Sequence, residues 1–161
     1  MAGTRDEGVT TADELQFVVF RLGTQQFGLA ITQVERILRY TPPAPVPEAP
    51  DFLEGVAPYA GGVVPVVDLR KRFGLDPVLR EETRMVVVQL EDQNVAVVVD
   101  QVMEVLRVDS REISSPPRMV RGLAAKYISG IISRPGGTIV VFNAARLLSS
   151  TERLALTEAR P

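Results

Sequence analysis

The chain contains an internal duplication, and this feature constrains its fold more than any other. The stretch that begins at Phe17 recurs from Met85, an offset of 68 positions, and residues 55–68 recur at 130–143, an offset of 75 positions. The unit order is therefore A, B, A′, B′. Two copies are too few for a solenoid, which needs three or more repeats. They predict instead a pair of like subdomains, with a seam between them where a partner can dock.

The composition excludes several classes of function. The 161 residues include no cysteine and no histidine, which rules out disulfides, thiol nucleophiles, Ser-His-Asp chemistry and histidine-ligated metals. The 18 basic and 20 acidic residues are interspersed, without the basic stripe that is typical of nucleic-acid binding. We therefore expect no catalytic residues, no metal, no cofactor and no nucleic-acid partner. A catalyst built from carboxylates, lysine or arginine stays open as an alternative.

The ends of the chain are expected to differ from its middle. Residues 1–14 are small and polar, which predicts a disordered tail, and residues 15–150 are expected to form the folded domain. Ser149 and Glu152 match a capping box and predict a C-terminal helix or tail at 151–161. No apolar run approaches the roughly 20 residues that cross a bilayer, and the polar start lacks a signal-peptide core. The expected location is the cytoplasm, without direct membrane insertion.

Short apolar runs predict a strand-rich fold. Residues 18–20 and 27–31 are rich in β-branched and aromatic residues, and a polar turn at 23–26 joins them. Both alternating faces of these runs are apolar, which favours small β-barrels that are covered on each side. Residues 63–69 predict another strand, in which Pro65 indicates an edge position or a bulge because proline cannot donate a backbone hydrogen bond.

Short helices are expected at the ends of the A units. Thr32 with Glu35 matches a capping box and precedes apolar residues at helical spacing. In the second copy Asp100 takes the cap position and a similar apolar stripe follows. Residues 70–74 predict a single helical turn that ends at Gly74. The whole pattern indicates an all-β protein with short helices.

Prolines and glycines mark the expected connections. The proline-rich residues 42–50 predict a stiff, extended surface segment, with a ligand for an SH3 or WW domain as the alternative. Paired glycines recur at matching places in the B and B′ units, so we interpret them as turns in which glycine supplies a positive φ. These glycines are Gly61, Gly62, Gly136 and Gly137.

Residues 55–74 resemble the signature of the CheW-type chemotaxis coupling (adaptor) proteins. They read Gly-Val-Ala-Pro-Tyr-Ala-Gly-Gly-Val-Val-Pro-Val-Val-Asp-Leu-Arg-Lys-Arg-Phe-Gly. The family pattern is Gly-Val-x-Asn-Leu-Arg-Gly-x, two hydrophobic residues, Pro-Val, a hydrophobic residue and Asp-Leu-Arg. The likeness extends over residues 15–150.

This resemblance implies a fold and a non-enzymatic function. The fold would be two five-stranded, SH3-like β-barrel subdomains that share a core. The function would be that of an adaptor that couples the tips of methyl-accepting chemoreceptors to the regulatory domain of a CheA-type histidine kinase. Receptors would dock in the groove between the subdomains, and the barrel ends would pair with the barrels of the kinase.

The chain departs from the family pattern at one place. The family turn carries an arginine that commonly pairs with a glutamate of the first A unit, but here these positions are Ala60 and Arg36. The preceding Asn-Leu positions are Pro58 and Tyr59. We hypothesise that Arg36 pairs with a carboxylate of a partner or with Glu54. The alternative is a solvated surface arginine, worth about 0–1 kcal/mol.

The candidate partner-binding residues combine the apolar positions near the seam with the altered turn. For each valine among them the alternative is a plain core role, and Tyr59 stands out because tyrosine is favoured at the centres of interfaces. The candidates are Val34, Arg36, Val56, Tyr59, Ala60, Val63, Val97, Val99 and Val102.

Two other observations leave alternatives open. Asp68 and Asp100 follow apolar runs and suggest a carboxylate pair, but helix capping or turn bonding explains them better. Rival functions are a small ligand-binding barrel with a deep pocket, a peptide-binding barrel that uses strand addition, and an accessory coupler of a pilus-based or other non-flagellar pathway.

Overall fold

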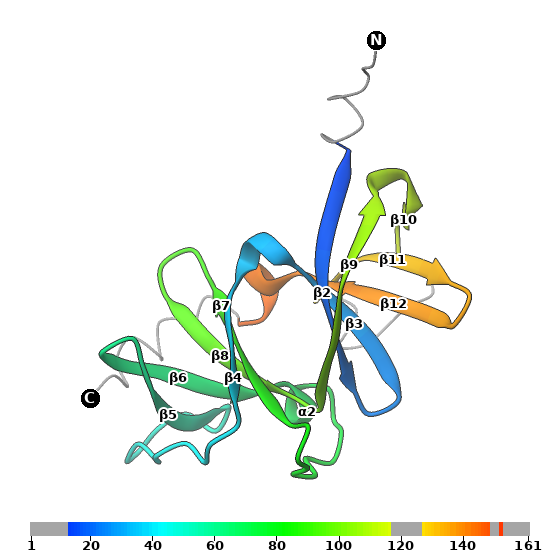
Figure 1. Ribbon diagram of the computed structural model, residues 1–161. Helices are drawn as coiled ribbons and strands as arrows, with labels where there is room; N and C mark the ends of the chain where they lie inside the picture. Colours follow the sequence, from blue (N-terminus) through cyan, green and yellow to red (C-terminus); the bar gives the residue numbers. More distant parts are fainter. Residues whose placement is uncertain (1–12, 117–126, 149–151, 153–161) are drawn as a thin grey trace.

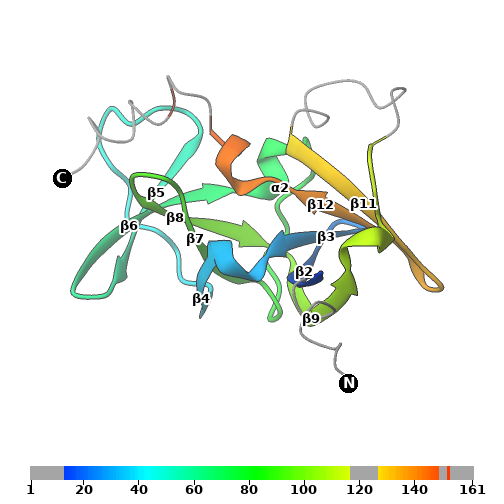
Figure 2. The ribbon, with the colours of Figure 1, turned by 90° about the horizontal axis from the view of Figure 1, so that it is seen from above.

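The structure is a computed structural model that describes residues 13–116, 127–148 and 152 (Figure 1). Two β-sheets lie side by side and are joined by short helical turns (Figures 1 and 2). This confirms the all-β class with short helices. The predicted tail and C-terminal helix lie outside the described residues, except that β2 already begins at Glu14 and that Glu152 is described.

The first sheet has six strands in the order β10-β11-β12-β3-β2-β9, and the second has five in the order β4-β7-β8-β6-β5. The strands of the first sheet are β2 (Glu14–Leu22), β3 (Gln25–Ala30), β9 (Gln101–Asp109), β10 (Ile113–Ser114), β11 (Ile128–Arg134) and β12 (Gly137–Phe142). Those of the second are β4 (Val34–Arg39), β5 (Leu53–Tyr59), β6 (Gly62–Asp68), β7 (Arg84–Gln89) and β8 (Asn94–Val99). The second sheet has the five strands that the resemblance implied, and the first adds the two-residue strand β10.

The part of the chain that the structure describes also includes four short helical turns. Three are 3-10 turns, η1 (Ile31–Gln33), η2 (Ser110–Glu112) and η4 (Ala144–Arg146). The fourth is the α-helical turn α2 (Leu69–Arg72), which follows β6 as the sequence predicted and is closed by Gly74 with φ +75°.

The two copies of the duplication exchange a strand. The hairpin β2–β3 of unit A shares a sheet with β11 and β12 of B′, while β7–β8 of A′ shares the other with β5 and β6 of B. The third strand of each A unit crosses over, so β4 pairs with β7 and β9 pairs with β2. The registers match: Val34 lies opposite Val88, and Val102 lies opposite Phe20. Each subdomain is therefore completed by the other copy.

The helices predicted after Thr32 and Asp100 are wrong, because these segments form β4 and β9. Thr32 lies within η1, whose N-cap Ala30 makes no side-chain cap. Pairing with β7 or β2 satisfies the strand backbone, a non-local contact that a local capping pattern cannot reveal. The apolar stripe is not a buried helix face either, because Ile37 and Val105 stay exposed. β-branched residues favour the extended form.

Pro65 lies in an inner strand, which corrects the edge prediction. β6 runs between β8 and β5. Val56, the partner of Pro65, exchanges its backbone hydrogen bonds with Ala44 at 2.8 and 2.9 Å, on the side away from β6. The Val56–Pro65 pair is thus a non-hydrogen-bonded one, and the ladder to β8 begins only at Val66. The missing N–H of Pro65 therefore leaves no gap in either ladder.

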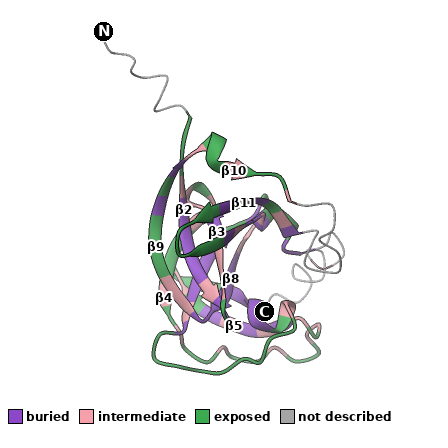
Figure 3. Ribbon diagram, turned by 90° about the vertical axis from the view of Figure 1, so that its right-hand side faces the viewer, coloured by how far each residue is buried: buried purple, intermediate pink, exposed green. Residues whose placement is uncertain are grey.

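The buried residues form one cluster shared by both sheets and one cluster inside each sheet, which confirms the predicted common core (Figure 3). The shared cluster contains Phe20 and Leu29 from the first sheet and Val88 and Val97 from the second. The Phe73 ring stacks on an aromatic ring of β3 with a centroid distance of 5.4 Å. Burial of this apolar surface holds the two sheets together.

The glycines that begin the B units have a role that the sequence did not reveal. A Cβ on Gly55 would lie 2.3 Å from the carbonyl oxygen of Ala44, and one on Gly130 would lie 2.6 Å from Cγ2 of Ile113. In both copies the preceding segment of the chain, at Ala44 or at Ile113, therefore passes directly over the glycine. The register of the strand pairing also shifts at the same place in both copies, between Leu53 and Gly55 and between Ile128 and Gly130.

The paired glycines are partly as expected. Gly61 has φ +80° and Gly137 has φ +136°, but Gly62 and Gly136 have no positive φ. The β5–β6 turn consists of Ala60, with φ +49°, and Gly61, because Tyr59 already pairs with Gly62. Two successive positive φ angles give the tight turn that suits a hairpin.

Candidate partner-binding surface

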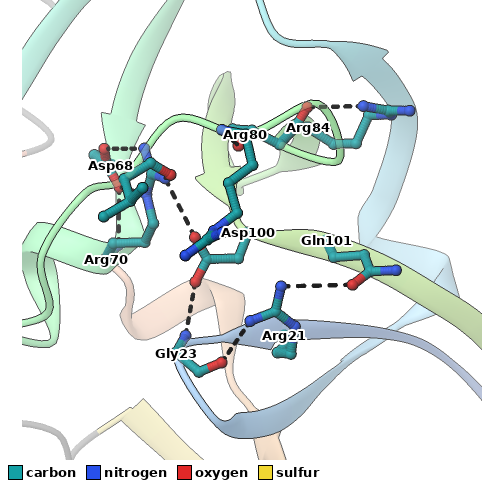
Figure 4. A network of polar contacts seen from close by, with 10 residues as sticks. Arg21, Gly23, Asp68, Arg70, Arg80, Arg84, Asp100 and Gln101 are labelled. Atoms are coloured by element: carbon teal, nitrogen blue, oxygen red, sulfur yellow. Dashed lines mark hydrogen bonds and ion pairs between the residues drawn. The ribbon is translucent and has the colours of Figure 1, made fainter.

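A buried ionic network joins the two sheets at the seam (Figure 4). Arg70 of α2 holds both oxygens of Asp68 at 3.0 Å and one oxygen of Asp100 at 3.2 Å. The other oxygen of Asp100 accepts a 2.7 Å hydrogen bond from the backbone N–H of Gly23, in the β2–β3 turn. Burial alone would lower the pKa of Arg70, but the hydrogen bonds and charges of the two aspartates outweigh it and raise the pKa. The network thereby ties the two sheets to each other.

The two aspartates are thus structural rather than catalytic. Asp68 caps α2 by accepting a hydrogen bond from the backbone N–H of Arg70, as predicted. Asp100 does not cap a helix but fixes the β2–β3 turn. Sequence reasoning singled out the carboxylates and missed Arg70, although the Asp-Leu-Arg run contained it. The single guanidinium of Arg70 pairs with both carboxylates, and the backbone N–H groups of Arg70 and Gly23 also donate to them, so neither carboxylate is buried without partners.

The predicted seam residues divide into two groups. Val97 and Val99 are fully buried in the shared core, so their side chains are out of reach of a partner. Val34 and Val102 are half-buried and pack against that core from β4 and β9. These two occupy equivalent positions in the two copies, so the pair marks the seam symmetrically.

A hydrogen bond closes the end of the second sheet. The Tyr59 hydroxyl donates to the Glu35 carboxylate, although β5 and β4 lie at opposite ends of the strand order. This bond and the carboxylate charge raise the pKa of Tyr59, while the nearby Arg36 opposes the rise. The sheet is therefore curved enough for side chains of its two outer strands to reach each other. Sequence reasoning missed Glu35 in this role because it was assigned to a capping box.

The altered turn and its surroundings form an exposed surface. Arg36 is exposed and has no ion pair with any residue that the structure describes. Its suggested pairing with Glu54 is wrong, because Glu54 binds Nζ of Lys71 at 2.8 Å. Ala60 is exposed at the tip of the hairpin, and Val63 beside it is 49% exposed. Arg36, Tyr59, Ala60 and Val63, here called the hairpin surface, are thus available for contact.

Two further observations concern the candidate residue Val56 and the search for membrane-spanning helices. Val56 is half-buried beside Ala44 of the proline-rich segment. That segment is extended around Ala44, as predicted, but turns at Pro47 and Glu48, where Glu48 has φ +58°. None of the helices in the described part is long and apolar enough to span a membrane.

Comparison with known proteins identifies the family. The protein-family model described as the CheW-like domain matches residues 16–152. The chain belongs to the CheW-like family. The chemotaxis protein CheW of Klebsiella aerogenes is 32% identical over 144 residues, covering 89% of this chain and 86% of that protein. Protein FrzA of Myxococcus xanthus is 28% identical over 159 residues, which cover 97% of this chain and 99% of that protein.

A solved CheW-like structure agrees with the fold. The scaffolding protein TtCheW of Thermoanaerobacter tengcongensis superposes with a TM-score of 0.77 at 29% identity, covering 86% of this chain and 94% of that one. The resemblance to the coupling proteins is confirmed, and with it the class of a chemotaxis adaptor rather than an enzyme.

Proposed function

We propose that this CheW-like protein couples the tips of methyl-accepting chemoreceptors to the regulatory domain of a CheA-type histidine kinase in the cytoplasm. The observation that supports this most is the position of the residues that depart from the family signature. Arg36, Tyr59 and Ala60 gather at the hairpin surface rather than in the core. Substitutions confined to a surface on a retained scaffold are what a change of partner requires.

The two docking places differ in chemistry. At the seam, Val34 and Val102 offer apolar area on a base held rigid by the Arg70 network, which suits a receptor tip. At the hairpin surface, Val63 and Tyr59 provide apolar and aromatic contact. The charge of exposed Arg36, which has no ion pair among the described residues, selects an acidic partner. A rigid scaffold keeps the two partners at a fixed spacing.

A second candidate is a coupler in a pilus-based or other non-flagellar chemosensory pathway. The rebuilt turn favours it, because a receptor or kinase of the standard pathway would meet Arg36 where the family has a glutamate.

The test is titration of the full chain with the regulatory domain of each CheA-type kinase from the same cell. We expect one of them to bind, and we expect Arg36→Glu to weaken that binding about tenfold through charge repulsion. The matched control is Arg107→Glu, an exposed arginine on β9. If none of these kinases binds, the coupling function is refuted. If Arg36→Glu binds as well as the wild type, the role of Arg36 is refuted.

A further inference from the structure

A second surface lies away from the residues assigned to partners so far. A hollow of about 640 Å³ opens between the end of β4 and the loop that leads into β7. Arginine, tyrosine, proline and leucine side chains line most of it. The lining residues are Arg39, Tyr40, Pro42, Leu79, Arg80, Glu81, Thr83 and Arg84.

Positive charge exceeds negative charge in this hollow, whose lining contains three arginines and one carboxylate, that of Glu81. Arg39 and Arg84 lie directly opposite each other in the β4–β7 register, an arrangement of like charges that destabilises an antiparallel pair. Neither arginine, nor Arg80 beside them, forms an ion pair with any residue in the described ranges. The chain as a whole carries a net charge of −2, so this local excess of cations is not a general property of its surface.

The loop that carries these arginines is held in place from inside. Arg84 donates from Nη1 to the carbonyl oxygens of Glu81 and Thr83 at 2.8 and 2.9 Å (Figure 4). The hydroxyl of buried Thr83 accepts a 2.9 Å hydrogen bond from the N–H of Arg80. Arg70 also binds the carbonyl oxygen of Val78 at 2.7 Å. The loop therefore presents its side chains without having to be ordered first, which favours binding.

The same loop exposes apolar side chains beside the charges. Leu79 is 61% exposed and Val78 is 48% exposed. Tyr40, at the end of β4, is half-buried and packs on the core of the second sheet. An apolar centre with aromatic and arginine neighbours is the composition of protein interfaces.

We propose that this surface, formed by Arg39, Tyr40, Leu79, Arg80 and Arg84, docks an acidic segment of a partner protein. An apolar side chain of that segment packs on Leu79, and its carboxylates pair with Arg39 and Arg84. Carboxylates bound beside Arg39 and Arg84 relieve the repulsion between these two neighbouring charges, which is the reason for an acidic occupant. The site does not depend on the receptor or kinase proposed above, because it lies on different residues.

The test uses a short fluorescent peptide in which glutamates flank two leucines, and anisotropy titration against the full chain. We expect saturable binding that weakens as salt rises, and about tenfold weaker binding of the same peptide with glutamine in place of glutamate. Arg39→Glu should weaken binding of the acidic peptide about tenfold or more. Leu79→Ser should weaken it several-fold while leaving the salt dependence unchanged.

Arg107→Glu is the matched control, because it changes the net charge equally but lies on β9 of the other sheet. We expect it to bind the peptide like the wild type, and thermal unfolding checks that every variant folds. The proposal is overturned by absence of binding, by equal affinity for the glutamine peptide, or by equal losses in Arg39→Glu and Arg107→Glu. It is also overturned if the chain self-associates through this face, so that Arg39→Glu yields monomers.

Discussion

The two copies of the duplication agree in their interiors and differ where their strands end. Phe17 and Val19 in the core of the first sheet correspond to Met85 and Val87 in the core of the second. After the last strand of each B unit the copies diverge: one continues with the buried Arg70 between two aspartates, while the other has Ala145, which is exposed. Apolar packing that both copies share builds the sheets, and polar contacts that only one copy has set their relation to each other.

The largest expected effect concerns the network that only one copy has. Arg70→Met leaves the carboxylates of Asp68 and Asp100 buried without a cation, which should cost about 3–5 kcal/mol of unfolding free energy. Urea denaturation measures the loss. Ala145→Arg at the equivalent position is the control and should change stability by less than about 0.5 kcal/mol. Similar losses of unfolding free energy in Arg70→Met and Ala145→Arg would show that the Arg70 network does not stabilise the fold.

The next prediction compares the two crossing glycines. Gly55→Ala forces a Cβ against a backbone carbonyl at φ +147° and should cost about 2–4 kcal/mol. Gly130→Ala brings its Cβ to 2.6 Å from a side-chain methyl of Ile113, but the nearest backbone atom is at an ordinary 3.4 Å and φ is not positive, so about 1–2 kcal/mol is expected. Thermal unfolding of both variants gives the order. A larger loss for Gly130→Ala would contradict it.

A smaller difference concerns the hairpin tips. Tyr59 hydrogen-bonds Glu35, while Arg134, its counterpart in the other copy, pairs with Glu112 at 3.6 Å. Tyr59→Phe should lower the free energy of unfolding slightly, independently of salt. Arg134→Gln should cost about 0–1 kcal/mol, less at high salt. Unfolding at low and high ionic strength separates the two, and equal salt dependence would argue against distinct contacts.

The smallest effect is a pH dependence of stability that arises from Asp109, on β9 of the second copy. The Arg111 side chain and backbone N–H lower the pKa of Asp109 from its ordinary value of 3.8 to about 2. Because the pKa is lower in the folded state, the stabilisation is present above pH 3.8 and is lost as the pH falls towards 2. NMR titration of Asp109 gives the pKa directly, with Glu104 as an exposed carboxylate for comparison. A pKa near 3.8 would contradict the contact.

The sequence predicted the parts of the fold that rest on local patterns. The duplication, the strand runs and the α2 turn follow from repeats, periodicity and glycine placement, and the shared core was implied by the resemblance to the CheW-type family. The helices after Thr32 and Asp100 were wrong, because pairing of β4 and β9 with distant strands outweighs a local cap. The exchange of these strands could not be read from the repeats, since the repeats show which segments are alike and not which of them pair.

The candidate surface was predictable only in part. The departures at Arg36 and Ala60 from the family pattern pointed to positions that the structure leaves exposed. Val97 and Val99 are buried, because an apolar residue type alone does not distinguish a position at the seam from a position in the core. Glu35 and Arg84 went unnoticed because their roles arise from cross-strand neighbours.

The exchange of β4 and β9 has a consequence for dividing the chain. A cut in the loop between α2 and β7 gives two fragments, each carrying strands of both sheets. Neither fragment contains a complete subdomain, so neither can fold alone or be transferred to another protein as an independent module. Mixed together, the two fragments should complement each other and reassemble.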